Sequence, residues 1–205
     1  MTNRRNFLSA AAALSAGASG LIAADQGINI IGPKPGYSPQ VGTLVSMLTW
    51  MQRAPLQAAR GLKQADLDVL FDSHANTIGA LLLHLAATET YYQMNTFDGM
   101  EWGSWPKAVS DKWDAAMNLG KPGRDTIKGH DLDYYVKTLQ DTREKSLAEF
   151  RKRDDAWLLS VDKTWPWGPT NNYCKWFHVC EHQSHHAGQI AFLRSRLPGA
   201  KADGD

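Results

Sequence analysis

Apolar residues recur every three or four positions along four long segments of the chain, which is the spacing of one helix face. Asp131 stands where the third of these segments needs an N-cap, and Asn171 or Asn172 does so for the fourth. No segment alternates apolar and polar residues as a half-buried strand would. The pattern therefore predicts helices over residues 40–53, 74–96, 131–153 and 172–197.

The segments between these helices contain the helix breakers. Pro55 is expected to kink or end the first helix, and a short helical piece is expected at residues 66–71. Residues 97–130 are rich in Gly and Pro and are expected to be irregular apart from a short helix around residues 110–118. Residues 154–171 are expected to form a loop. Four long helices joined in this way predict an all-α fold, an antiparallel four-helix bundle whose two long connections permit crossovers.

The start of the chain resembles an export signal. Arg4-Arg5 followed by Phe7-Leu8 matches the twin-arginine pattern, and the Ala-rich stretch behind it is too diluted by Ser and Gly for a stable membrane anchor. We expect a twin-arginine signal peptide over residues 1–24 and a periplasmic or other extracytoplasmic location; the alternative is a disordered or helical N-terminus. The expected order is then a linker at 25–39, the bundle at 40–198 and a disordered tail at 199–205.

The composition excludes several classes of protein. The chain has 22 basic and 21 acidic side chains, and this balance argues against a protein that binds nucleic acid through phosphate contacts. Two cysteines are too few for a disulfide scaffold or an all-cysteine zinc site. A hydrophobic fraction of 43% is enough to form a buried core, so wholesale disorder is excluded.

Histidines are clustered near the C-terminus, where four of the seven fall within nine residues. His182 and His186 lie four apart and therefore one above the other on a helix, spaced to bind a single ion. His178 lies one turn earlier, and Gln189 returns to the same face. His84, alone in an apolar run, is the best candidate for a third ligand, although a lone histidine in such a run is more often a core residue.

Three histidine ligands leave one position open, which is typical of catalytic rather than structural zinc sites. Nickel, iron or manganese would also suit three imidazoles. The alternative is a solvated polar face that binds no metal. Tyr91 lies seven residues after His84 and is either a helper that points a phenol at the site or a core aromatic. Trp102, Trp105, Trp165 and Trp167 either wall a pocket or pack the loops down.

The segment from His182 to Ile190, with His84 in an apolar helix followed by Glu89 and Tyr91-Tyr92, resembles the DinB/YfiT-like superfamily of metalloenzymes. The resemblance extends over residues 40–198. It implies a four-helix bundle with a crossover, often dimeric, and a metal triad of His84, His182 and His186. One departure is Ala187, where many relatives carry an Arg that would suit an anionic substrate or thiol.

These observations favour an exported, metal-dependent hydrolase in which water bound to a three-histidine ion is the nucleophile. His178, Gln189 and Tyr91 are the candidate helpers. One alternative is a non-catalytic module that binds a metal or a small ligand. Another is a thiol-dependent S-transferase or isomerase, which predicts a cationic patch beside the metal. The expected partners are a small-molecule substrate and a second copy of the chain, with no nucleic acid.

Overall fold

The computed structural model describes residues 27–200, of which residues 31–200 lie in one compact unit. The expected signal peptide at residues 1–24 lies outside the described residues, as do residues 25–26 of the linker and 201–205 of the tail. Within the described range, every helix is too short or too polar to cross a bilayer.

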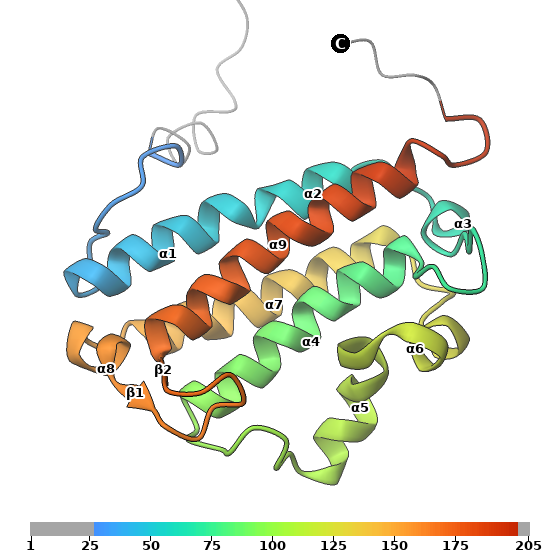
Figure 1. Cartoon of the computed structure of the whole chain (residues 1–205). Helices are drawn as coiled ribbons and strands as arrows, with labels where there is room; N and C mark the ends of the chain where they lie inside the picture. Colours follow the sequence, from blue (N-terminus) through green and yellow to red (C-terminus); the bar gives the residue numbers. More distant parts are fainter. Residues whose placement is uncertain (1–26, 201–205) are drawn as a thin grey trace, which may run out of the picture. The chain divides into compact units, whose positions relative to one another are not determined.

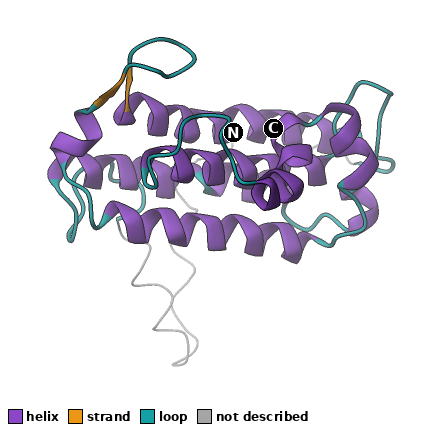
Figure 2. Cartoon of the chain, turned by 90° about the horizontal axis from the view of Figure 1, so that it is seen from below, coloured by secondary structure: helices purple, strands orange, loops and turns teal. Residues whose placement is uncertain are grey.

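The chain is all-α, as the periodicity predicted, apart from one short β-hairpin. The long elements are α1 (Pro39–Met51) with α2 (Arg53–Ala59), α4 (Ile78–Thr96), α7 (Leu132–Phe150) and α9 (Asn172–Arg194) (Figure 1). The short elements are α3 (Gln64–Leu67), α5 (Lys107–Asn118), α6 (Gly120–Thr126), α8 (Asp155–Leu159), β1 (Val161–Asp162) and β2 (Thr170–Asn171). The two strands pair antiparallel and stand out from one end of the helices (Figure 2).

Two of the predicted caps are observed. The Asp131 carboxylate accepts from the Tyr134 amide at the start of α7, and the Asn171 side chain accepts from the Cys174 amide at the start of α9. Helix α4 begins at Ile78 because Thr77, at its N-cap, accepts from the Ala80 amide. Each cap satisfies an amide that would otherwise lack a partner in the first turn, so these helices begin at fixed residues.

Two expectations for the connecting segments were wrong, and the one for Pro55 was confirmed. Helix α1 ends at Met51, whose carbonyl would need the N–H that Pro55 lacks, and Pro55 then lies in the first turn of α2. Pro122 is likewise in the first turn of α6, so a helix forms where the Gly and Pro content predicted irregular chain. The expected loop at 154–171 contains α8 and the β-hairpin.

Contacts between α4 and α7 show that these two helices run parallel. Glu89 bonds to Arg143, and further along both helices the carbonyl of Phe97 accepts from Arg153. The chain must therefore return to its starting end between them, and α5 and α6 lie on this return path (Figure 1). Of the two long connections proposed from the sequence as crossovers, the one after α4 takes that course.

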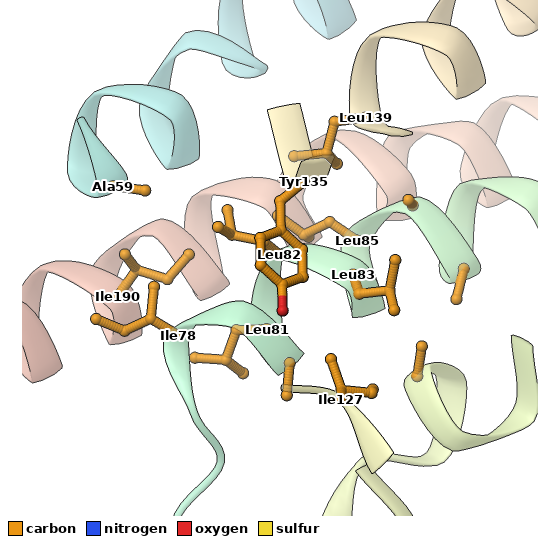
Figure 3. Packing of buried hydrophobic residues seen from close by; sticks show 14 of the residues in the cluster. Ala59, Ile78, Leu81, Leu82, Leu83, Leu85, Ile127, Tyr135, Leu139 and Ile190 are labelled. Atoms are coloured by element: carbon orange, nitrogen blue, oxygen red, sulfur yellow. The ribbon is translucent and has the colours of Figure 1, made fainter. Parts of the chain in front are cut away.

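The core lies between α4 and the helices around it. Helix α4 packs against α7, α9 and α5, and α9 packs against α1 and α2. Figure 3 shows Leu81, Leu82 and Tyr135 within this core. A Cβ at Gly79 would lie 2.6 Å from the Tyr135 hydroxyl oxygen, so glycine is what lets the Tyr135 ring lie against α4.

A buried ion pair joins α4, α7 and α1. Arg143 donates to both carboxylate oxygens of Glu89, at 2.7 and 2.8 Å, and to the Leu48 carbonyl of α1 at 2.6 Å. Ser146 adds a third hydrogen bond to the Glu89 carboxylate. Both charged side chains are almost completely buried, at 3% and 2% exposure. Removing one partner would leave the other charge buried without compensation.

Arg143→Ala is therefore expected to lower the free energy of unfolding by about 3–5 kcal/mol. The exposed pair Lys137–Asp141 on the same helix supplies the control, and Lys137→Ala should cost less than about 1 kcal/mol. Denaturant unfolding of both variants measures the difference. Equal losses would contradict the assignment of Arg143 as a core contact.

Candidate metal centre

The two halves of the candidate site come from antiparallel helices. His84 lies on α4, and His182 and His186 lie on α9. Residue numbers rise along α4 from His84 to Tyr92, while the residues of α9 that contact them fall in number from His182 to His178. His84 therefore faces His182, and Tyr92 faces His178, as the two helices pass in opposite directions. The structure brings together the three histidines proposed as ligands, named here the three-histidine cluster.

The three imidazoles converge through their Nε2 atoms. The Nε2 atoms of His84 and His182 are 2.8 Å apart, and those of His182 and His186 are 3.1 Å apart. Three ligand nitrogens arranged tetrahedrally at about 2.05 Å from a zinc ion would be about 3.3 Å apart. The observed spacing is thus close to what one ion requires.

The Nδ1 atoms of two of these histidines are bonded to oxygen acceptors. His84 Nδ1 donates to the Ala116 carbonyl at 2.9 Å, and His186 Nδ1 donates to Gln189 Oε1 at 2.7 Å. A neutral imidazole with its proton on Nδ1 presents a lone pair at Nε2. His84 and His186 therefore both present lone pairs where the three rings meet. These ligand atoms fit a divalent cation.

Burial keeps these imidazoles neutral. His84 and His186 are 7% and 5% exposed. Desolvation lowers the pKa of His84, and it lowers those of His182 and His186 to about 3 and about 4, with repulsion from the neighbouring histidines adding to the effect. At neutral pH all three rings are therefore available as ligands, because only the neutral imidazole binds a metal.

A cavity of about 150 Å³ adjoins His84 and His182. Its other lining residues are Thr88, Tyr92, Trp102, Met117, Trp165, Pro166, Trp167 and His178. None of the lining residues carries a carboxylate, an ammonium or a guanidinium group. The cluster therefore has an open, largely apolar side.

The structure places the three proposed helpers differently from one another. His178 lines the cavity and is hydrogen-bonded through Nδ1 to the Tyr92 hydroxyl at 2.7 Å. Gln189 lies on the far side of His186 and fixes its ring through Nδ1. Tyr91 is not brought to the site: its hydroxyl bonds to Asp114 of α5 and its ring stacks on Trp105.

Tyr92 is the phenol that sequence reasoning missed. The expected seven-residue return from His84 pointed to Tyr91, but the face of α4 that α9 covers carries Thr88 and Tyr92, four and eight residues beyond His84. The histidines of α9 recur four residues apart, and applying the same spacing to α4 from His84 would have pointed to Tyr92. Burial raises the pKa of the Tyr92 hydroxyl, which therefore stays protonated at neutral pH.

The structure is thus an all-α protein whose three converging imidazoles could hold a metal ion beside a cavity. A family model, Mycothiol-S-transferase, matches residues 43–199. The chain therefore belongs to the mycothiol-S-transferase family, a DinB/YfiT-like family, as the sequence resemblance indicated.

Solved structures share the fold at low sequence identity. A conserved protein from Enterococcus faecalis is 14% identical, with a TM-score of 0.56 over 74% of this chain and 93% of its own. An uncharacterised protein from Clostridium difficile 630 is 11% identical, with a TM-score of 0.58 over 77% and 97%. A search of curated proteins found no match.

Metal binding gives the first test of this centre. Wild-type protein dialysed against zinc should retain about one ion per chain, and the double variant His182→Ala/His186→Ala should retain essentially none, because one imidazole cannot hold the ion alone. His130→Ala, which changes a histidine outside the cluster, is the control. Full zinc occupancy in the double variant, measured by elemental analysis, would refute the ligand assignment.

The lowered histidine pKa values predict how the metal-free protein responds to acid. The unfolded chain takes up protons near the ordinary histidine pKa of 6.5, whereas in the folded chain His182 and His186 do so only near pH 3 and pH 4. The contribution of these histidines to the free energy of unfolding should therefore be fully present above about pH 6.5 and be lost as the pH drops toward 4. Thermal unfolding should show a lower Tm at pH 5 than at pH 7, and a smaller change in the double variant. An equal change in both proteins would contradict this account.

Proposed function

We propose that this protein is a metal-dependent transferase that joins a small thiol to an uncharged electrophile at the three-histidine cluster. The observation that carries the proposal is the convergence of three Nε2 atoms beside an open cavity. Membership of the mycothiol-S-transferase family supports a thiol as the nucleophile. A divalent ion at the cluster would act as a Lewis acid and lower the pKa of a thiol bound to it.

The residues of the chain would then orient the ion and handle the proton. Ala116 and Gln189 hold the outer nitrogens of His84 and His186, so both rings keep their Nε2 lone pairs directed at the ion. The Tyr92 hydroxyl and His178 form a hydrogen-bonded pair on the cavity wall. In the transfer, the thiol sulfur would form a bond to the electrophilic carbon and the leaving group would depart with its electron pair. The thiol proton would go to His178, the basic member of the Tyr92–His178 pair.

Hydrolysis is the second candidate, with water in place of the thiol. Specific observations favour it: no Lys or Arg lines the cavity at the cluster, and position 187 is Ala. A separate cavity of about 500 Å³ beside His185 and Gln189 is also lined without Lys or Arg. The cationic patch expected for an anionic thiol is therefore absent from the residues that line these two cavities. Water needs no such patch.

Export by the twin-arginine route also forms part of the proposal. It rests on Arg4-Arg5 and Phe7-Leu8 in the sequence. Because that route carries folded proteins, the metal would be acquired before export. A small-molecule substrate and a homodimer complete the proposed set of partners, with zinc as the favoured ion.

Zinc-loaded protein incubated with mycothiol and chloroacetamide should form the thioether faster than the uncatalysed mixture. The variant His84→Ala/His182→Ala should lose at least about a hundredfold in rate, because the Lewis acid is worth several kcal/mol. Mass spectrometry follows the thioether, and His130→Ala is the control that should keep the wild-type rate.

Two parallel assays separate the two candidates: thioether formation with the thiol present, and hydrolysis of an acetate ester with the thiol omitted. Thioether formation without ester hydrolysis would support the transferase, whereas zinc-dependent hydrolysis of an acetate ester with no thioether would support the hydrolase. An equal rate in the double variant would refute both.

A further inference from the structure

Four Tyr and Trp rings line the 150 Å³ cavity, and the proposed chemistry gives a role to only one of them. Tyr92 comes from α4, Trp102 from the segment before α5, and Trp165 and Trp167 from the β1–β2 hairpin. Ring centres lie 4.7 Å apart for Trp102 and Trp165, 5.2 Å for Tyr92 and Trp102, and 5.5 Å for Trp165 and Trp167. These contacts are edge-to-face, the arrangement that aromatic rings prefer.

The chemistry of the wall selects an uncharged ligand. Its lining includes no carboxylate, ammonium or guanidinium group, so in the metal-free protein a charged ligand would lose its hydration without gaining an ionic partner there. The Tyr92 hydroxyl is already bonded to His178. Trp165, only 4% exposed, has a buried indole N–H with no partner among the described residues. A ligand oxygen is the kind of acceptor that this N–H lacks.

The volume of the cavity limits the size of the ligand. A protein cavity of about 150 Å³ lined by apolar side chains accommodates benzene. We propose that this cavity binds an uncharged, benzene-sized aromatic ring of the substrate and holds the group attached to it toward the three-histidine cluster. Calling the ring part of a substrate rests on the proposed function; binding of the ring itself does not require the metal.

Trp167 is the wall residue whose side chain can be truncated without loss of the fold. Its side chain is 58% exposed, yet its ring lies 5.0 Å from His178 and 5.5 Å from Trp165. Truncation at this position would take away an aromatic contact without leaving a buried void, so the fold should survive.

The test is to titrate benzyl alcohol into metal-free protein and to follow binding by calorimetry and by ligand-observed NMR. Saturable binding at one site per chain is expected. Trp167→Ala should weaken it about three- to tenfold, the range for loss of one aromatic contact. Trp50→Ala removes another exposed indole, on α1 and outside the cavity lining, and should leave the affinity unchanged.

Two further ligands test the chemical class. Cyclohexylmethanol has no aromatic face and should bind more weakly than benzyl alcohol, and benzoate should show no saturable binding because it is charged. Benzoate binding as tight as that of benzyl alcohol, or an unchanged affinity in Trp167→Ala, would overturn the inference. Ring binding in a protein with no transfer or hydrolytic activity would overturn the proposed function alone. Zinc-dependent activity with no ring binding would overturn this inference alone.

Discussion

Helix α4 is buried on nearly all of its faces, so the polar side chains it carries must find partners inside the protein. Glu89 finds Arg143 of α7, and Thr96 accepts from the indole of Trp176 on α9. His84 finds the Ala116 carbonyl and His182. Each of these bonds fixes one helix against α4. The candidate site therefore lies along α4, the central helix, whose buried polar side chains need partners on the surrounding helices.

The contacts of His84 differ in kind from those of Glu89. The carboxylate of Glu89 meets only donors, so its bonds to Arg143 and Ser146 are complementary. The Nε2 atom of His84 instead faces the Nε2 atom of His182, with its own proton held on Nδ1 by Ala116. A converging set of lone pairs is costly in a buried place unless a cation lies between them. Around Glu89 hydrogen-bond donors face acceptors, which stabilises the core. Around His84 ligand nitrogens face one another, which suits a bound cation.

Much of this arrangement follows from the sequence, but only where the pattern is local. The i, i+4 spacing of His182 and His186 is a property of one helix and predicted their common face. The caps at Asp131 and Asn171 depend on bonds within one turn and were also predicted. Choosing Tyr91 over Tyr92 failed because the relevant face of α4 is set by where α9 packs. Periodicity along a single helix contains no information about that partner.

The aromatic wall of the cavity depends on contacts distant in sequence for the same reason. Its Tyr92 and Trp167 rings contact His178, whereas Trp165 is held by Lys175. The Lys175 ammonium lies 4.3 Å from the centre of the Trp165 ring and bonds to Asp162 of the hairpin at 2.7 Å and to Asn95 of α4 at 2.8 Å. The hydrogen bond from Lys175 lowers the pKa of Asp162 to about 2, so this ion pair persists in mildly acidic solution. Trp165 is thus fixed by contacts that the three-histidine cluster does not share, and loss of the metal should leave that side of the cavity in place.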